Sequence, residues 1–421
     1  MDKKRTVTAK KNPVFQGKGL CDPHGLVVGN TLYLFMGRDA DPKGGGFAMD
    51  DWQVWKTTDG VNFTHCTTIL PEETFAGKTH DCWATHAVEK NGFYYFYFSD
   101  ANHSIGVMKS DRPNGGYKDV LHRPLVAENS TPTMSYDPHV FIDDDGTPYL
   151  LFGAPKWAYG DNADGYYIAR LKETMIELDE TPRKVCVNHP GDDKPALHKF
   201  RGVYYLSWAS FYATSETVYG PYTFRGNIGV SRDHGSFFEW NHQWFFSFGT
   251  YDPYPMFRNS ALTYIHYREN GEMAADSLIN EYGVGKYSAD WNRIFAAWYM
   301  KASRYMKRES KNGGFEVADM QDGDYLVFPK VIGIPKRAEI HFLISADKTA
   351  APGRLEVRRE TPHGALLAAM EINKTQGYDY GCYTMLTATL APHKKTEDLC
   401  FIVRGNPGCC LTLSSFSFSE I

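Results

Sequence analysis

The feature that most constrains the fold is a sequence pattern that recurs five times before residue 280 of the 421-residue chain. Each copy contains a turn with Gly or Asn, then a run rich in aromatic residues, then a small or polar residue. The five runs are GNTLYLFMG, NGFYYFYFSD, DGTPYLLFG, RGVYYLSWAS and NHQWFFSFG, which begin at residues 29, 91, 145, 201 and 241. Aromatic residues that follow a hairpin-type turn indicate β-strands.

A partner strand is predicted on the amino-terminal side of each run, and most runs are followed by a further strand. The preceding segments read HGLVV, HAVEK, HVFID, PALHK and SFFEW. Each unit therefore contains three or four antiparallel strands, and the units are spaced by roughly 40–60 residues, a period typical of propeller blades. We predict a five-bladed β-propeller over residues 1–284, with its blades packed around a central axis.

Beyond residue 285 the repeat stops, but strand patterns continue. Six segments alternate apolar and polar residues between turn signals, and they span residues 338–343, 353–358, 366–372, 382–390, 399–404 and 411–418. This arrangement predicts a β-sandwich of the jelly-roll type over residues 285–421. The whole chain is therefore expected to be all-β.

Composition narrows the range of partners and of compartments. The formal net charge is −5, and the one clearly basic stretch is Lys3–Lys11, so nucleic acid is not an expected partner. No apolar run is long enough to span a membrane. No apolar segment follows the basic start, so we expect a cytoplasmic protein whose eight cysteines are free thiols, or a secreted one if a leader has been removed.

Acidic residues recur just upstream of the aromatic runs, at nearly the same place in each unit. Asp22 precedes Pro23 in the first unit, Asp137 precedes Pro138 in the third, and Asp193 lies in the fourth. Because the innermost strands of a propeller converge at its axis, we predict that these three carboxylates face one pocket. Clustered carboxylates acquire different pKa values and can then act as general acid and general base. Asp-Pro also opens turns, so each aspartate taken singly has a structural interpretation as well.

Several segments of this half together resemble glycoside hydrolase family 43. The third unit reads YDPHVFIDDDG from residue 136 and continues with PYL at residue 148. Six further segments are similar to segments of the family's other blades: WA at 83, NGFYY at 91, GPY at 220, HGS at 234, QW at 243 and FR at 257. The resemblance covers about residues 13–275 in order. It implies an inverting glycosidase that needs no cofactor for its chemistry.

The resemblance also implies roles for individual residues. Asp22 is similar to the base that activates water, and Asp137 to the aspartate that tunes the pKa of the acid and orients it. Asp193 aligns with the general acid. Trp83 stands where an aromatic ring lines the sugar pocket, and Arg258 is similar to an arginine that reaches the substrate.

His234 is similar to a histidine at the propeller axis of the family. That histidine often lies near a bound calcium ion and close to the substrate. The resemblance therefore implies that His234 contributes to the substrate pocket and to a structural Ca²⁺ site at the axis.

The sequence departs from the family at the general acid. The family has Glu-Gly-Pro where this chain has Asp193-Lys194-Pro195. The shorter side chain withdraws the carboxyl group by roughly 1 Å, and a misplacement of that size can cost about 100-fold in rate. Lys194 also places a cation beside the acid. Three interpretations remain: the backbone brings Asp193 forward, Asp192 serves instead, or the protein binds sugars and hydrolyses them poorly.

The carboxyl-terminal half resembles the carbohydrate-binding modules of family 6 at two segments, DGDYL from residue 322 and LTLSSFSF from residue 411. The Gly-Gly-Trp turn of that family is replaced by GYDY at 377–380, and Thr412 and Ser414 stand where its last strand has Asn and Asp. Sugar binding and a packing role both stay open for this half. Trp291, Trp298 and Tyr378 fit a hydrophobic core as well as a sugar platform.

Together these features predict an exo-acting inverting glycosidase. Its expected substrates are oligosaccharides or polysaccharides of plant hemicellulose, from which it would remove α-L-arabinofuranosyl or β-D-xylosyl residues. A β-galactosidase or galactofuranosidase of the same fold is one alternative. A non-catalytic sugar-binding propeller that has lost its general-acid Glu is another.

Overall fold

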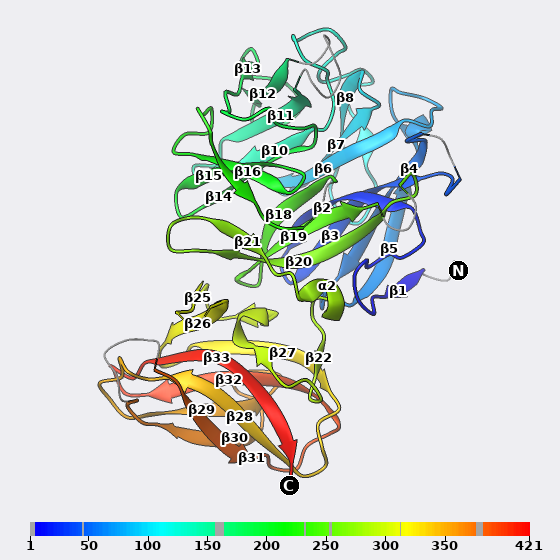
Figure 1. The fold of residues 1–421 in the computed structure, drawn as a ribbon. Coiled ribbons are helices and arrows are strands. Elements are labelled where there is room, and N and C mark those ends of the chain that lie inside the picture. Colours follow the sequence, from blue (N-terminus) through cyan, green and yellow to red (C-terminus); the bar gives the residue numbers. More distant parts are fainter. Residues whose placement is uncertain are drawn as a thin grey trace. The chain divides into compact units, whose positions relative to one another are not determined.

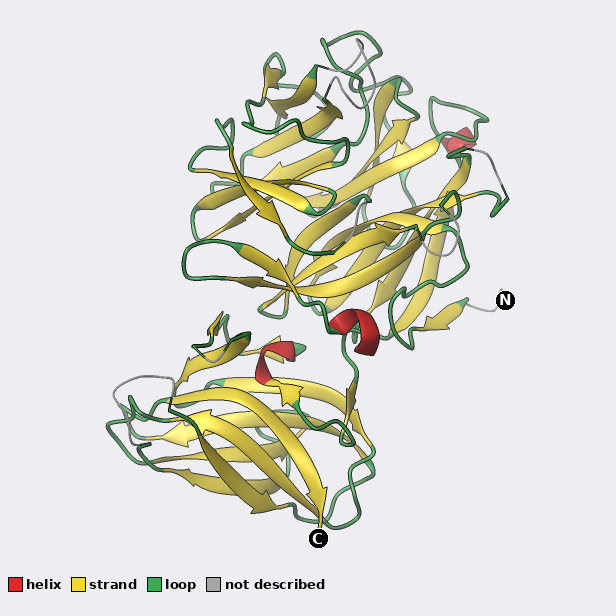
Figure 2. Cartoon of the chain, viewed as in Figure 1, coloured by secondary structure: helices red, strands yellow, loops and turns green. Residues whose placement is uncertain are grey.

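The computed structural model describes residues 5–43, 46–155, 164–230, 233–251, 255–311, 313–375 and 382–421. Strands dominate this part of the chain (Figure 2), and its α-helix α2 (Ile279–Tyr282) is a single turn. No described helix has the length and hydrophobicity that crossing a membrane requires. The chain divides into two compact units, residues 1–238 with 245–263 and residues 239–244 with 264–421. This division falls earlier than the domain boundary at residue 284 that the repeats predict.

The repeated units form five antiparallel sheets in the described part of the chain (Figure 1). The edge strands that precede the aromatic runs are β2 (Leu20–Val28), β6 (Cys82–Lys90), β10 (His139–Ile142), β14 (Pro195–Phe200) and β18 (Gly235–Trp240). The aromatic runs themselves form β3 (Thr31–Asp39), β7 (Phe93–Asp100), β11 (Pro148–Ala154), β15 (Val203–Trp208) and β19 (Gln243–Thr250). Both sets agree with the strands predicted from the repeat.

The outer strands complete the sheets in chain order, as in β6-β7-β8-β9. They are β4 (Met49–Thr57), β5 (Asn62–Ile69), β8 (Ser104–Ser110), β9 (Lys118–Asp119), β12 (Gly165–Arg170), β13 (Arg183–Lys184), β16 (Phe211–Ser215), β17 (Thr223–Asn227), β20 (Asn259–Tyr267) and β21 (Met273–Ala275). The short β1 (Thr6–Thr8) pairs with β5 at the outer edge of the first sheet. This meander confirms the predicted five-bladed propeller.

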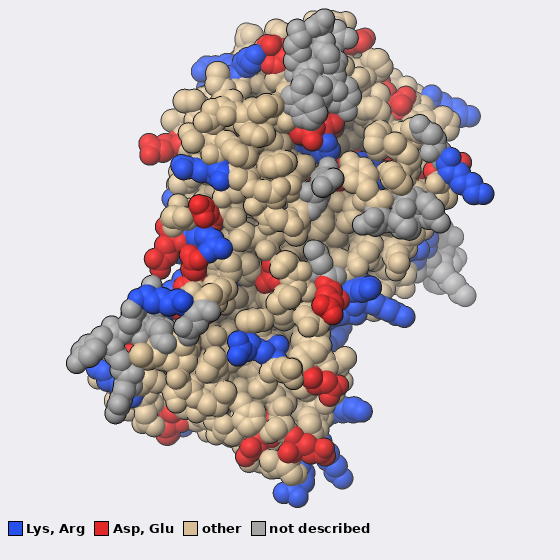
Figure 3. Space-filling model, in the orientation of Figure 1, with Lys and Arg blue, Asp and Glu red and all other residues tan. Residues whose placement is uncertain are grey.

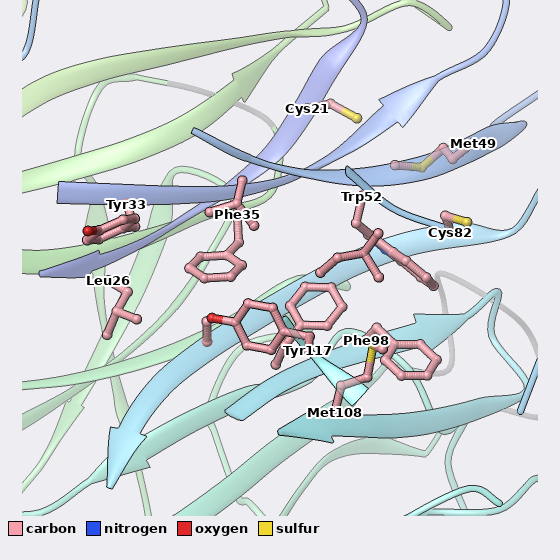
Figure 4. Packing of buried hydrophobic residues seen from close by; sticks show 14 residues of the cluster. Cys21, Leu26, Tyr33, Phe35, Met49, Trp52, Cys82, Phe98, Met108 and Tyr117 are labelled. Atoms are coloured by element: carbon pink, nitrogen blue, oxygen red, sulfur yellow. The ribbon is translucent and has the colours of Figure 1, made fainter. Parts of the chain in front are cut away.

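Aromatic side chains from the runs fill the space between neighbouring blades. Phe35 and Trp52 of the first blade pack against Phe96 and Phe98 of the second, and the rings of Trp52 and Phe98 lie 4.9 Å apart (Figure 4). These four side chains are almost completely buried. Burial of one such side chain contributes roughly 1.5–3 kcal/mol, so the aromatic content of the repeats holds the blades together.

The innermost strands converge at the axis, where histidines of different blades meet. The ring of His24 on β2 lies 4.8 Å from that of His86 on β6 and 4.9 Å from that of His234, which directly precedes β18. The rings of His86 and His139 are 4.1 Å apart. Residues that are far apart in sequence are therefore neighbours here, and this convergence also positions the carboxylates described below.

The second unit contains two six-stranded sheets. One comprises β22 (Tyr287–Ser288), β24 (Lys301–Ala302), β27 (Tyr325–Ile332), β29 (Gly353–Arg359), β30 (Leu366–Ile372) and β32 (Thr396–Gly405). The other comprises β23 (Ile294–Phe295), β25 (Lys307–Glu309), β26 (Phe315–Met320), β28 (Ala338–Ser345), β31 (Thr384–Thr389) and β33 (Leu411–Glu420). All six segments predicted between residues 338 and 418 are strands.

Four phenylalanines join these two sheets into a sandwich. Phe401 on β32 lies 4.8 Å from Phe342 on β28 and 4.8 Å from Phe416 on β33, measured between ring centroids. Phe328 on β27 is 4.9 Å from Phe416. The predicted β-sandwich is confirmed. The GYDY segment at 377–380, with Tyr378, lies outside the described residues.

The two tryptophans considered as sugar platforms differ in exposure. Trp298 is buried and packs against Phe295 and Trp291, whereas Trp291 is half-buried and its ring lies 4.2 Å from that of Tyr282. The Trp298 side chain therefore belongs to the core. On the face of the molecule that Figure 3 shows, acidic and basic side chains are interspersed without a continuous area of either sign.

Candidate active site

Asp22 and Asp137 share an unusual backbone conformation. Their φ angles are 49° and 53°, in the left-handed region, and each residue directly precedes a proline. Left-handed conformations are costly for most L-residues and tolerated by Asp, and they concentrate at functional sites. The pairing of β2 with β3 shifts register between Cys21 and His24, at the position of Asp22. Equivalent places in blades one and three therefore present their carboxyl groups in the same way.

Both carboxylates line a cavity of about 230 Å³. All six site residues predicted from the sequence line this cavity: Asp22, Trp83, Asp137, Asp193, His234 and Arg258. They come from five different blades. The prediction that equivalent positions of the repeat converge on one pocket therefore agrees with their placement.

Arg258, directly before β20, is the buried cation of the cavity. Its Nη1 donates to Oδ1 of Asp22 at 2.8 Å, and its Nη2 donates to Oδ1 of Asp39 at 3.0 Å. Both carboxylate oxygens of Asp233 lie 3.4 Å from Nη1. Burial alone would lower the pKa of Arg258, but Asp22 and the other carboxylates outweigh that effect and raise it. The guanidinium therefore stays charged and fixes the orientation of Asp22.

Burial raises the pKa of Asp22 to about 7, although Arg258 opposes the shift. The pKa of Asp137 is likewise raised by burial to about 7, against the influence of the Lys194 ammonium and of the Lys194 backbone N–H, which donates to Oδ2 of Asp137 at 2.9 Å. Asp233 raises the pKa of both groups. Carboxyl groups that change protonation near neutral pH are suited to proton transfer.

The segment Asp192-Asp193-Lys194 leads into β14 and contains the predicted acid. Lys194 has a φ of 69°, a conformation that favours the glycine that family 43 has here. Its ammonium contacts the carboxylate of Asp193 and lies 3.6 Å from Oδ2 of Asp192. Burial raises the pKa of Asp192 in spite of Lys194. Asp192 therefore holds its proton more readily than an exposed aspartate, as a general acid must.

Aromatic side chains form one wall of the cavity. Trp83 is half-buried, its indole Nε1 donates to the carbonyl oxygen of Phe47 at 3.0 Å, and its ring lies 6.4 Å from that of Tyr136. The hydrogen bond holds the indole in place while part of the side chain remains exposed. A fixed aromatic ring in a cavity is suited to packing against the C–H groups of a sugar.

Sequence reasoning did not assign several residues of this site: Asp39, Phe47, Tyr136, Asp233 and Tyr251. Asp233 is buried, and the hydroxyl of Tyr251 donates to its Oδ1 at 3.1 Å. The signal for Asp233 was present, because it precedes the fifth aromatic run at the repeat position that singled out Asp22 and Asp137. Asp39 lies on β3, and its role as a partner of Arg258 depends on a contact across 219 positions of sequence.

His234 lies at the axis beside the cavity, where the resemblance implies calcium. Its Nδ1 is 3.8 Å from Oδ1 of Asp137, and its buried Nε2 has no hydrogen-bond partner in the described structure. Burial lowers the pKa of His234 well below its usual value, and Lys194 contributes to the shift. The groups that surround its ring include other imidazoles, whereas Ca²⁺ binds through six to eight oxygen ligands. Calcium at the axis would therefore need water for most of its oxygen ligands, and the calcium site stays a prediction.

Comparison with known proteins decides the family. The model of glycosyl hydrolases family 43 matches residues 10–273 of this chain. The chain belongs to glycosyl hydrolase family 43. The match covers the whole repeat region, and it confirms the resemblance that the third-blade segment indicated.

Two relatives of this family 43 hydrolase are named for sugars of arabinoxylan, and a third is named for galactofuranose. An arabinoxylan arabinofuranohydrolase of Paenibacillus polymyxa is 25% identical over 88% of this chain and 68% of its own length. A xylosidase/arabinosidase of Bacteroides ovatus is 29% identical over 52% of this chain and 81% of its own. A β-D-galactofuranosidase of Aspergillus niger is 27% identical over 55% of this chain and 73% of its own.

Solved structures share the fold of this hydrolase. An arabinoxylan arabinofuranohydrolase from Bacillus subtilis, in complex with cellotetraose, has a TM-score of 0.59 at 21% identity and covers 99% of both chains. A family 43 enzyme of Xanthomonas citri, complexed with xylose, has a TM-score of 0.55 at 27% identity over 64% of this chain and 93% of its own. The first comparison extends the similarity of fold to the carboxyl-terminal sandwich.

Proposed function

We propose that this glycoside hydrolase is exo-acting and inverting, and that it releases terminal α-L-arabinofuranosyl or β-D-xylosyl residues from arabinoxylan-type oligosaccharides. The observation that carries the proposal is the pair Asp22 and Asp137. Both carboxylates have the same left-handed backbone conformation and line one cavity together with Asp192 and Asp193.

In the proposed reaction, Asp22 takes a proton from a water molecule as the water oxygen attacks the anomeric carbon. Asp192 or Asp193 gives a proton to the glycosidic oxygen as the bond between that oxygen and the anomeric carbon breaks. The configuration is inverted because water enters on the face opposite the leaving group. Arg258 keeps Asp22 in place through the 2.8 Å hydrogen bond, and Asp137 orients the acid segment through the Lys194 backbone N–H.

The size of the cavity supports removal of single sugar residues. Its volume of about 230 Å³ is below the roughly 300–1,000 Å³ of sites for drug-sized ligands. A cavity of this size suits one sugar residue held between the carboxylates and the ring of Trp83. The names of the Paenibacillus and Bacteroides relatives support arabinose and xylose as that residue. The Aspergillus relative keeps a galactofuranosyl residue as the second candidate.

The test is turnover of 4-nitrophenyl α-L-arabinofuranoside, β-D-xyloside and β-D-galactofuranoside by the wild type and by Asp22→Asn, Asp192→Asn and Asp193→Asn. Loss of the base should lower kcat by roughly 10²–10⁴-fold. Asp179→Asn, at a half-exposed surface position paired with Arg170, is the matched control and should keep full activity.

The choice between the two acids needs a second substrate. Nitrophenolate can leave without being protonated. The sugar that leaves from an arabinoxylan oligosaccharide must instead receive a proton on its glycosidic oxygen. The variant that lacks the true general acid should therefore lose far more activity on the oligosaccharide than on the aryl glycoside. A wild type inactive on all of these substrates, but able to bind the oligosaccharide, would overturn the proposal in favour of a sugar-binding propeller.

A further inference from the structure

A second cavity, of about 380 Å³, lies in the second unit and shares no residue with the catalytic cavity. Its lining comes from α2 and the residue before it, and from the segment that follows β22. Both parts precede the two stretches, at 322 and 411, by which this half resembles carbohydrate-binding modules. The hydrolytic reaction proposed above uses none of its four aromatic side chains, which are Tyr282, Trp291, Phe295 and Trp298.

The buried ring of Trp298 is the base of this cavity, and the other aromatic rings pack around it. Its centroid lies 4.9 Å from that of Phe295 and 6.0 Å from that of Tyr282. The ring of Trp291 meets it edge-on at 6.3 Å. The indole Nε1 of Trp298 donates to Oδ2 of Asp276 at 2.5 Å, which fixes the base. Because the rings rest on a fixed base, a ligand does not have to order them when it binds.

Trp291 is presented by a turn that the backbone holds in place. Its N–H donates to the carbonyl oxygen of Ser288 at 3.1 Å, and the N–H of Ala289 donates to the carbonyl oxygen of Ile332 on β27 at 2.8 Å. The rings of Trp291 and Tyr282 lie 4.2 Å apart at an angle of 42°, and both side chains are half-buried. Part of each of these two rings is therefore left for contact with a ligand.

Polar side chains surround the rings. Asp290, Asn292 and Arg293 line the same cavity, and all three residues are exposed. A carboxylate, an amide and a guanidinium together donate and accept hydrogen bonds, as the hydroxyl groups of a sugar require. Asp290 and Arg293 have opposite charges, so this rim is not complementary to a polyanion or to a polycation. Aromatic faces combined with such a rim are suited to a neutral pyranose, whose C–H groups pack on a ring.

We propose that this cavity binds the β-linked xylan main chain of arabinoxylan, with Trp291 and Tyr282 stacking on its pyranose rings. The choice of this ligand rests on the proposed hydrolase function. Removal of an arabinofuranosyl residue leaves the main chain intact, so a second contact with that chain keeps the enzyme on the polymer between cleavages. Two linked contacts raise the effective concentration of substrate at the catalytic cavity.

The experiment measures binding of linear xylohexaose to the full chain by titration calorimetry. Asp22→Asn with Trp83→Ala is the parent protein, because it leaves the ligand uncleaved and weakens binding at the catalytic cavity. This parent should bind xylohexaose, and adding Trp291→Ala should weaken the binding by about tenfold. Adding Trp291→Phe instead keeps an aromatic ring and should recover most of the affinity. A Tm close to that of the parent would show that each variant is folded.

Leu366→Ala in the same parent is the matched control. Leu366 is an apolar residue of β30, 46% exposed, and it does not line the cavity, so its loss should leave the affinity unchanged. The inference is wrong if the parent does not bind xylohexaose, if Trp291→Ala binds it as tightly as the parent, or if Leu366→Ala loses as much affinity. Tighter binding of cellohexaose than of xylohexaose would overturn the assignment of the ligand.

Kinetics separate this inference from the proposed function. Trp291→Ala alone should keep the wild-type kcat/KM on 4-nitrophenyl α-L-arabinofuranoside, which has no main chain, and should lose several-fold in kcat/KM on polymeric arabinoxylan. An equal loss on both substrates would contradict a role in binding the main chain. A wild type without activity would overturn the proposed hydrolysis, and the titration would then decide the inference by itself. An active wild type whose parent protein and Trp291→Ala variant bind xylohexaose equally would overturn the inference and leave the hydrolysis in place.

Discussion

The ammonium group of Lys194 contacts the carboxylate of Asp193, its direct neighbour in the chain. At the same time the backbone N–H of Lys194 donates to Oδ2 of Asp137 at 2.9 Å. One residue therefore holds two carboxylates of the site, one through its side chain and one through its backbone. The two contacts can be separated by mutation, because only the first needs the lysine side chain.

Lys194→Gly should fold normally and should raise kcat on arabinoxylan oligosaccharides. Glycine adopts the φ of 69° without strain, keeps the N–H that binds Asp137, and frees the Asp193 carboxylate from its cation. Lys194→Ala, which also lacks the ammonium but keeps the strained φ, should show the gain in kcat with a lower Tm. Equal losses of activity in both variants would mean that the ammonium binds substrate, and would contradict the expectation.

The pH dependence of kcat/KM should be bell-shaped. Asp22 must be ionised to act as the base, and burial raises its pKa to about 7, so the rate should fall about tenfold per pH unit on the acidic side. The acid must be protonated, so the rate falls again on the alkaline side. Lys194 lowers the pKa of Asp192, and Lys194→Gly should therefore move the limb that Asp192 sets to higher pH. If neither limb of the profile moves in this variant, Asp192 is not the acid.

Stability should depend on pH through the same buried carboxyl group. The pKa of Asp22 is about 7 in the folded protein and 3.8 without the influence of the fold, so the folded state holds the proton more tightly. This contribution is complete at low pH and is lost as pH rises from about 4 to about 7. Asp22→Asn lacks this contribution. The difference in free energy of unfolding between Asp22→Asn and wild type should therefore shift in favour of the variant by about 3 kcal/mol between pH 5 and pH 8. Thermal or urea unfolding at the two pH values measures the change, and a difference that is independent of pH would contradict it.

Trp83→Ala should raise KM more than it lowers kcat. The indole ring lines the cavity and is fixed by its hydrogen bond to the Phe47 carbonyl, so its loss removes packing against the sugar. A loss of about 1.4 kcal/mol corresponds to a tenfold change in kcat/KM. Trp83→Phe keeps an aromatic ring and should recover most of the affinity. If the two variants were equally impaired, the hydrogen bond rather than the ring face would be the important contact.

The sequence predicted the architecture well because the propeller is built from local units. Turn residues, aromatic runs and partner strands lie within about ten residues of one another, so each blade could be identified by itself. The positions of Asp22 and Asp137 followed from the same reasoning, since equivalent places in a repeat occupy equivalent places around an axis. The strands of the sandwich were also predicted, because the alternation of apolar and polar residues is itself a local pattern.

Other features depend on contacts that no local pattern encodes. The choice between Asp192 and Asp193 is governed by where the Lys194 side chain lies and by how deeply each carboxylate is buried. Asp39 joins the site through Arg258, which is more than 200 positions away in sequence. The histidine side chains that surround His234 could not be anticipated either, since they come from other blades.

The sequence by itself determined that this protein is an all-β propeller and sandwich with aspartates at matching places of its blades. Strand periodicity and turn chemistry are short-range properties that each segment carries alone. Only the tertiary structure decided which of those aspartates share a cavity with Arg258 and Lys194, how burial shifts the pKa values of Asp22 and Asp137, and which histidines meet at the axis. Burial and electrostatic interaction act through space, and the distances that govern them exist only once the blades have closed around their axis.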